Sequence, residues 1–180
     1  MKRPKLMVAM NGGRSVSTLM ATAINIRKAS TADLVDINPV IDAAIMTWDL
    51  PERVKRLSLP SYHYTEHDLQ TIALMVAEAN NKNIVGVAAW DRADSKDAPS
   101  GYNTLLLHGI YVEPAHHHQG IGQQLLQAAE QAAIEQGYNA LLVKAQASAA
   151  GFFLAQGMRP LQVENASRDY AHRYWKPLKP

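Results

Sequence analysis

A long apolar run followed by a glycine-rich turn is the most informative pattern in this chain. Residues 104–112 show no regular polar alternation, which predicts a buried central strand. The run leads into a turn that ends at Gly120 and Gly122, and residues 123–136 then carry apolar positions at helical spacing. The pattern therefore predicts a strand, a tight turn and a helix. Gly109 inside the run indicates a bulge or a close approach of the backbone.

The start of the predicted helix lacks a side-chain cap. Ser, Thr, Asp and Asn are the usual N-caps, and residues 118–122 contain none of them. The first-turn N–H groups and the positive end of the helix dipole are therefore left for another acceptor. Glycines let a ligand approach that backbone closely, so we expect a phosphorylated small molecule to bind here. A glycine turn selected only for tight packing is the alternative.

Strands and helices alternate along the rest of the chain. Apolar or alternating segments predict strands and a C-terminal hairpin at residues 24–27, 72–79, 84–90, 141–143 and 158–176. Helical spacing predicts helices at residues 39–48, 51–60 and 149–156, the first of them starting at Pro39. The order β-α-α-β-β-β-α-β-α-β-β predicts an α/β single domain with a mostly antiparallel first half. The last strand is expected to carry Tyr170, Tyr174 and Trp175.

Composition narrows the possible functions. The chain has 180 residues, a net charge of +2 and no cysteine. The small charge argues against a strongly basic nucleic-acid footprint, and the lack of thiols excludes disulfides, thiolate metal sites and cysteine nucleophiles. No apolar run approaches the roughly 20 residues of a membrane span. We therefore expect a cytoplasmic protein without nucleic-acid or membrane partners.

The first residues differ from the rest of the chain. Met1–Lys5 is basic and Asn11–Ser15 is rich in turn residues. The apolar stretch Leu6–Met10 is shorter than the roughly 7–15 residues of a signal-peptide core. We interpret residues 1–22 as an N-terminal extension and residues 23–180 as the domain.

The glycine turn resembles that of the GNAT superfamily of N-acetyltransferases. The match consists of Val112-x-Pro114, the loop that ends in Gly120-Ile121-Gly122, and the helix that follows. The family pattern in this loop is Gln or Arg, two residues, Gly, one residue, then Gly or Ala. His117 stands at the first position, where this sequence departs from the family. The departure is minor, because such a loop acts mainly through backbone N–H groups.

A second motif extends the resemblance, which covers about residues 24–176. The segment Ala149-x-x-Phe152-Phe153-x-x-x-Gly157-Met158 resembles a family segment of the form Ala-x-x-(Leu or Phe)-Tyr-x-x-x-Gly-Phe. Two spaced motifs on the expected elements are more specific than either alone. Together they imply a mixed central sheet flanked by helices, with central strands that splay apart.

The resemblance also implies an activity and a cofactor site. Such proteins transfer acetyl from acetyl-CoA to a primary amine by direct attack on the thioester. The acceptor here would be a small-molecule amine or a peptide N-terminus, and a homodimer is compatible with the sequence. The implied cofactor-binding residues are Ile110, Tyr111, Val112, His117, His118, Gln119, Gly120, Ile121, Gly122, Gln123, Ala149, Phe152 and Phe153.

Two residues bear on the chemistry. His108 precedes Val112 by four residues, where some family members have a catalytic histidine, and an imidazole ordinarily has a pKa of about 6.5. We therefore take His108 as the candidate catalytic base; a core histidine paired with a backbone carbonyl is the alternative. Phe153 stands where many family members have a tyrosine as general acid, and it has no proton to donate. Either no side-chain acid is used, or a hydroxyl such as that of Tyr170 or Tyr174 serves.

Other aromatic and histidine residues have less specific interpretations. Tyr62 and Tyr64 lie in an otherwise polar loop and are candidate substrate-binding residues in the acceptor-pocket wall. For Trp48 and Trp90, core packing is the expectation. The run 116–118 of three histidines does not predict a metal site, because adjacent turn residues point in different directions and no carboxylate is spaced to complete one.

Two other functions compete with acetyl transfer. A non-catalytic acyl-CoA-binding sensor on the same fold is the alternative that Phe153 keeps open. A dinucleotide-binding oxidoreductase is a third interpretation, but residues 120–125 lack the third glycine of that fingerprint. The preceding antiparallel hairpin also argues against a doubly wound parallel sheet.

Overall fold

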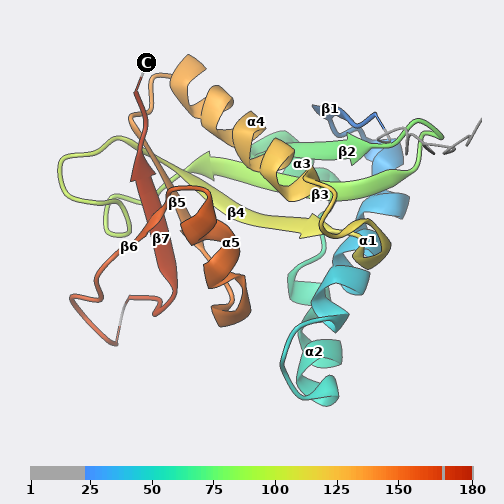
Figure 1. The fold of residues 1–180 in the computed structure, drawn as a ribbon, viewed down its shortest axis with the longest axis horizontal. Helices are drawn as coiled ribbons and strands as arrows, with labels where there is room; N and C mark the ends of the chain where they lie inside the picture. Colours follow the sequence, from blue (N-terminus) through green and yellow to red (C-terminus); the bar gives the residue numbers. More distant parts are fainter. Residues whose placement is uncertain (1–22, 168, 180) are drawn as a thin grey trace, which may run out of the picture.

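The computed structural model describes residues 23–167 and 169–179, so the extension predicted for residues 1–22 lies outside the described residues. Within the described chain, one sheet of seven strands has the order β1-β2-β3-β4-β5-β7-β6 (Figure 1). Only β4 and β5 pair in parallel. The predicted α/β class and mixed sheet are confirmed. The strands are β1 (Asn25–Lys28), β2 (Ala73–Glu78), β3 (Ile84–Arg92), β4 (Thr104–Val112), β5 (Ala140–Lys144), β6 (Arg159–Pro160) and β7 (Arg173–Pro177).

Helices cover both faces of this sheet (Figure 1). The helices are α1 (Leu34–Met46), α2 (Glu52–Ser58), α3 (Glu66–Thr71), α4 (Ile121–Glu135) and α5 (Ala150–Ala155). On one face, Ile41 of α1 is buried in a cluster with Val87 of β3. On the other face, Leu125 of α4 is buried in a cluster with Ala88, the next residue of β3. No helix in the described ranges is long and apolar enough to cross a lipid bilayer.

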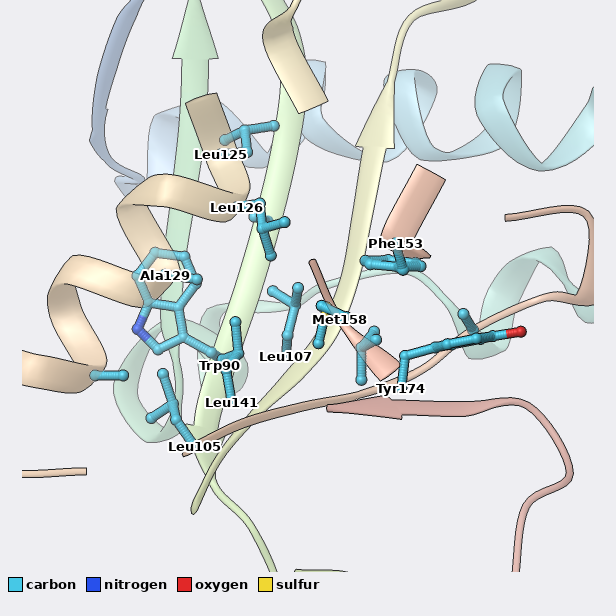
Figure 2. Packing of buried hydrophobic residues seen from close by; sticks show 14 of the residues in the cluster. Trp90, Leu105, Leu107, Leu125, Leu126, Ala129, Leu141, Phe153, Met158 and Tyr174 are labelled. Atoms are coloured by element: carbon cyan, nitrogen blue, oxygen red, sulfur yellow. The ribbon is translucent and has the colours of Figure 1, made fainter. Parts of the chain in front are cut away.

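The core under α4 includes buried side chains from the central strands. Figure 2 shows Trp90 of β3, Leu107 of β4 and Leu141 of β5 beneath Leu126 of α4. Each of the three aliphatic side chains is at most 1% exposed, and Trp90 is 3% exposed. Burying a side chain of this size contributes about 1.5–3 kcal/mol to the stability of the fold. Trp90 is therefore a core residue, as expected from the sequence.

The start of α1 differs from the prediction. The helix begins at Leu34, before the predicted start at Pro39, which lies inside it with an exposed ring. A capping box explains the earlier start: the Asp33 carboxylate accepts from the N–H of Ser30 at 2.7 Å and from its hydroxyl at 2.8 Å. The helix continues through Pro39 despite the missing N–H, because apolar side chains on both sides of it pack against the sheet.

Two further differences concern short segments. The predicted polar loop that holds Tyr62 and Tyr64 leads into α3, which begins after a capping box between Thr65 and Asp68. Tyr170 lies in the loop before β7 and not on the strand, which begins at Arg173. Both segments are too short to show a hydrophobic period, and boundaries of this kind are set by local capping and by strand pairing.

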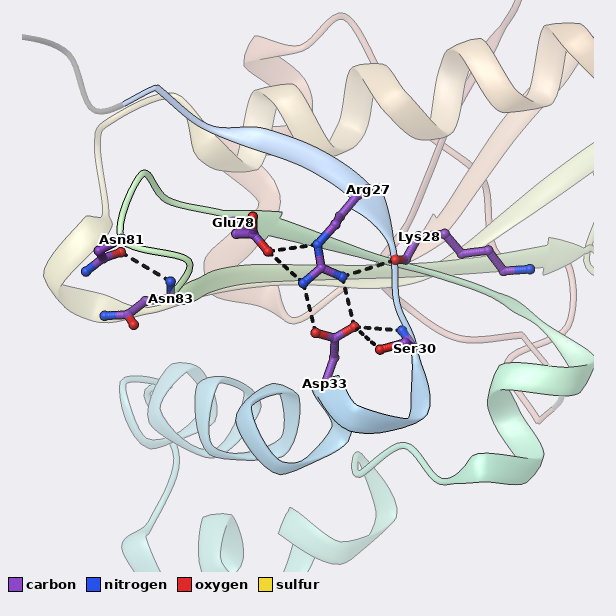
Figure 3. A network of polar contacts seen from close by, with 7 residues as sticks. All are labelled: Arg27, Lys28, Ser30, Asp33, Glu78, Asn81 and Asn83. Atoms are coloured by element: carbon purple, nitrogen blue, oxygen red, sulfur yellow. Dashed lines mark hydrogen bonds and ion pairs between the residues drawn. The ribbon is translucent and has the colours of Figure 1, made fainter.

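A partly buried network of ion pairs at the edge of the sheet joins β1, β2 and the segment before α1. The guanidinium of Arg27 donates to Glu78 at 2.8 Å and, through two nitrogens, to Asp33 at 2.8 Å each (Figure 3). The Asp33 side chain is 12% exposed. Hydrogen bonds from Arg27 hold the pKa of the Asp33 carboxyl well below its ordinary value, and hydrogen bonds from Ser30 act in the same direction.

Asp33→Asn is therefore expected to lower the free energy of unfolding by about 1–3 kcal/mol at neutral pH. A carboxyl whose pKa is lowered by folding stabilises the fold above its unfolded pKa of about 3.9, and this contribution is lost as the pH falls further. The difference between the wild type and the variant should thus shrink below about pH 4. Urea unfolding at neutral pH and below about pH 4 measures this difference in the free energy of unfolding. Asp49→Asn, at an exposed position after α1, is the control; an equal loss in both variants would contradict the role of the network.

Candidate active site

The two central strands separate toward their carboxyl ends. β4 and β5 pair in parallel only as far as Leu107 and Val143. β5 ends at Lys144, whereas β4 continues to Val112. The last residues of β4 therefore have no partner strand on the β5 side. The splayed central strands predicted from the sequence are confirmed.

The backbone of β4 offers polar groups to this gap. The N–H of Glu113 donates to the carbonyl of Val85 at 2.9 Å, which leaves the adjacent pair of Gly86 and Val112 as a non-hydrogen-bonded pair. The N–H and C=O of Val112, and by alternation those of Ile110, thus point away from β3 and toward the gap. The backbone groups of the intervening residue, Tyr111, point toward β3 instead.

A cleft of about 720 Å³ opens between the end of β4, the start of α4 and the region of α5. All the cofactor-binding residues predicted from the sequence line this cleft, with the exception of Gln119. The side-chain amide of Gln119 instead donates to the carbonyl of Ala115 at 3.3 Å. Several residues that the sequence reasoning missed also line the cleft: Ala44, Thr47, Trp48, His116, Ser148 and Gln156.

The first turn of α4 is a row of unused backbone donors. Gly120 is the N-cap, with φ 79°, and no side chain caps the helix. His118 also has a positive φ, of 60°. In the part of the chain that the structure describes, the N–H groups of residues 118–123 have no hydrogen-bond acceptor. Together with the helix dipole, such a row suits a phosphate group. Gly122 lies in the first turn of α4, and its backbone is not left-handed.

Two of the three consecutive histidines have fixed partners. The Nε2 atom of His117 lies 2.9 Å from the carbonyl oxygen of Val112, so the ring donates this hydrogen bond. The Nδ1 atom of His116 lies 2.8 Å from the Glu113 carboxylate, which is ion-pair distance without the geometry of a hydrogen bond. The described residues contain no group of three or more potential metal ligands. The His117 ring thereby ties the glycine loop to the end of β4.

His108 occupies a bulge in β4. Ala89 pairs with Gly109 and Trp90 pairs with Leu107, which leaves His108 as the extra residue. The bulge predicted from Gly109 is confirmed. His108 Nε2 lies 2.9 Å from an oxygen of Asp91, and both side chains are about one-third exposed. Because a carboxylate only accepts, the neutral ring carries its proton on Nε2 and has Nδ1 free.

The position of His108 relative to the cleft follows from the pairing. Asp91 pairs with Leu106, which packs away from α4, on the opposite face of the sheet from Leu107. His108 contacts Asp91 on that face and does not line the cleft. The imidazole is therefore accessible from the side of the sheet that faces α1, next to the point where β4 leaves β5.

Tyr111 explains why glycine is needed at position 109. A Cβ atom on Gly109 would lie 2.7–2.8 Å from the ring and hydroxyl of Tyr111, closer than real contacts allow. The tyrosine side chain thus folds back over the bulge. Burial raises the pKa of the Tyr111 hydroxyl well above its ordinary range, so that it remains protonated. The predicted close approach at Gly109 is confirmed, and the group that makes it is a side chain of the same strand.

The sequence matches the acetyltransferase (GNAT) family over residues 43–158, which is more than half of the chain. The chain belongs to the GNAT family. It is therefore an acetyltransferase that uses acetyl-CoA as cosubstrate, in agreement with the cleft and its row of free N–H groups. No curated protein matches the sequence.

Solved structures share the GNAT fold at low sequence identity. The PaiA N-acetyltransferase of Thermoplasma acidophilum, in complex with coenzyme A, has 18% identity and a TM-score of 0.71, with 86% of this chain and 99% of that chain covered. A GNAT acetyltransferase of Brucella melitensis in complex with acetyl-CoA has 18% identity and a TM-score of 0.58, covering 88% and 90%. AtaT complexed with acetyl-methionyl-tRNA has 18% identity and a TM-score of 0.56, covering 86% and 95%.

The GNAT position of the general-acid tyrosine is filled by a packed phenylalanine. Phe153 is 4% exposed and stacks on Tyr174 with ring centres 6.0 Å apart (Figure 2). The Phe152 ring contacts it edge-on at 5.0 Å. Both rings line the cleft as well as the core. Phe153 is accordingly held by packing, and no proton donor stands at this position.

The two tyrosines predicted to bind substrate have different surroundings. Tyr62 contacts Trp48 edge-on at 5.4 Å and Tyr111 at 6.5 Å, which places it beside the cleft. The backbone of Tyr64 is fixed by Asn38, which accepts from its N–H at 3.0 Å and donates to its carbonyl at 3.1 Å. Burial raises the pKa of the Tyr64 hydroxyl. Trp48, expected as a core residue, is half-buried and lines the cleft.

Proposed function

We propose that this acetyltransferase is an N-acetyltransferase, which transfers acetyl from acetyl-CoA to a primary amine by direct attack of the amine on the thioester. One arrangement carries the proposal: β4 carries a candidate base where it leaves β5, and free backbone donors follow its carboxyl end. A row of free backbone N–H groups lies on the α4 side. The His108–Asp91 pair, with a free imidazole nitrogen, lies on the α1 side.

The residues around the gap fit acetyl-CoA. The N–H groups of residues 118–123 would hold its pyrophosphate, and the outward N–H and C=O groups of Ile110 would pair with the amides of its pantetheine arm. The aromatic wall of Phe152 and Phe153 would flank the thioester end. Acetyl-CoA supplies an activated acyl group whose thiolate can leave without assistance, which suits a site with phenylalanine at position 153.

The protein has to move one proton and stabilise one charge. The amine nitrogen forms a bond to the thioester carbon, the C–S bond breaks, and the proton lost by the amine goes to Nδ1 of His108. Asp91 holds the ring in the tautomer that leaves Nδ1 free. The N–H of Val112 points toward the gap and would donate to the oxyanion. His108 is thus proposed as the base.

The acceptor site is proposed on the α1 side, with Tyr62 and Tyr64 in its wall. Tyr62, Trp48 and Tyr111 form a connected set of aromatic rings there. Burial, and then the Tyr62 hydroxyl, raise the pKa of the Tyr170 hydroxyl. A small-molecule amine or a peptide N-terminus would approach between these rings. AtaT, a structural neighbour, is complexed with acetyl-methionyl-tRNA, so the test uses more than small amines.

A thioester-release assay over a panel of amines, peptides and aminoacyl-tRNA tests the proposal. We expect release of CoA with at least one primary amine and formation of its N-acetyl product. Acetyl-CoA should also stabilise the fold, by roughly 2.7 kcal/mol at a hundredfold excess over its Kd. Stabilisation by acetyl-CoA without CoA release would favour an acyl-CoA-binding sensor. Stabilisation by NAD but not by acetyl-CoA would contradict the proposed cofactor.

A further inference from the structure

The cleft lacks the cations that usually accompany phosphate sites. No lysine or arginine lines it in the part of the chain that the structure describes. Among the described residues, the lining side chains that can become positively charged are the consecutive residues His116, His117 and His118. Acetyl-CoA carries a pyrophosphate and a 3′-phosphate, so a neutral protein surface would meet several negative charges there.

The three histidines differ in what faces them. His116 has the Glu113 carboxylate 2.8 Å from Nδ1, so a charge on His116 would be largely neutralised within the protein. In the described chain, His117 and His118 have no carboxylate within ion-pair distance. The other groups that face the cleft from α1, α4 and α5 are uncharged: Thr47, Trp48, Gln123, Ser148 and Gln156.

Both rings lie beside the row of free N–H groups. The Nε2 atom of His117 donates to the Val112 carbonyl at 2.9 Å, so Nδ1 is the nitrogen that can take up a proton. His118 has a φ of 60° at the start of the row of free N–H groups, and its ring lies 6.2 Å from that of His117. Both side chains are exposed at the mouth of the cleft. A proton on either ring adds positive charge beside the bound anion.

We propose that His117 and His118 supply the counter-charge for the acetyl-CoA phosphates, so that cofactor binding takes up protons. The proposal rests on the proposed cofactor site but not on the identity of the acceptor amine. By linkage, an anion that binds the protonated rings more tightly raises their proton occupancy. Acetyl-CoA affinity should therefore increase as the pH falls through the range in which imidazoles titrate.

Isothermal titration calorimetry with acetyl-dephospho-CoA tests this inference. This ligand keeps the pyrophosphate and lacks the 3′-phosphate, which itself titrates at a pH of about 6. For the wild type at low salt, we expect Kd to be about tenfold lower near pH 5.5 than near pH 8, because each of the two charged rings can change the affinity by up to roughly fivefold. Titrations in two buffers of different ionisation enthalpy should show net proton uptake.

Variants assign the protons to these rings. His117→Gln places the family's residue in the loop and keeps a donor for Val112, and His118→Asn tolerates left-handed backbone. The double variant should bind acetyl-dephospho-CoA with an affinity that does not change with pH, and it should not take up protons. His67→Gln, at an exposed position in α3, should behave as the wild type. Tight, pH-independent binding by the wild type, or equal proton uptake by the double variant, would overturn the inference. Absence of binding at every pH would instead count against the proposed cofactor site.

Discussion

Replacing His108 with alanine is expected to lower kcat by about 10²–10⁴-fold, the usual contribution of a positioned general base. The fold and the affinity for acetyl-CoA should be retained. His108 is the extra residue of the β4 bulge, is about one-third exposed, and does not line the cofactor cleft. The loss should therefore appear in kcat, measured with a saturating concentration of one amine, and not in the KM for acetyl-CoA.

The pH profile distinguishes a base from a structural histidine. The wild-type rate should rise with pH as the imidazole loses its proton, and this limb should weaken in His108→Ala. Ionisation of the amine produces a similar limb, so both proteins must be compared with the same substrate. Asp91→Asn should reduce kcat less, because it perturbs the orientation of the ring and leaves the base in place.

His67→Ala is the matched control, since this exposed histidine of α3 has no ionic partner among the described residues. It should leave kcat unchanged. An unaltered kcat and pH profile in His108→Ala would assign this residue a structural role. A loss of kcat in His67→Ala, with no loss in His108→Ala, would indicate that the proton leaves through the segment between α2 and β2.

Local chemistry explains why the strand, the glycine turn and α4 could be predicted. An apolar run, two glycines and the lack of a cap residue act within a few positions, so each can be recognised without knowing the fold. The same holds for the bulge at Gly109, because glycine inside a strand signals a limited set of geometries. Even there, the sequence could not tell that the side chain approaching Gly109 would be Tyr111.

Features that depend on tertiary pairing could not be predicted. The partner of His108 is Asp91, and their contact requires both the β3–β4 register and the bulge. Trp48 lines the cleft because the end of α1 lies beside the cleft, and no sequence motif marks position 48. The start of α1 is a different case, because the Ser30–Asp33 capping box is a local signal that outweighs the one from Pro39. In each case a contact between distant elements, or a competing cap, decided the outcome.

Gly122→Val is expected to weaken acetyl-CoA binding by about 10–100-fold, the cost of losing one or two hydrogen bonds to a charged group. A Cβ atom at position 122 would lie 3.4 Å from the Phe152 ring and 3.9 Å from Ile110, which is ordinary contact. Alanine therefore fits, and Gly122→Ala is the matched control. The two methyl groups of valine would extend into the cleft beside the free N–H groups of the first turn.

Calorimetric titration of both variants with acetyl-CoA measures the effect, and thermal unfolding without ligand checks the fold. A β-branched residue in the first turn of α4 costs the helix little, because the backbone there is helical and valine has only a slightly lower propensity than other residues. The stability of Gly122→Val should thus stay close to that of Gly122→Ala while their affinities differ. If a folded Gly122→Val variant binds acetyl-CoA as tightly as the wild type, the phosphates do not lie on the first turn of α4, and the free N–H groups of residues 118–123 have another purpose.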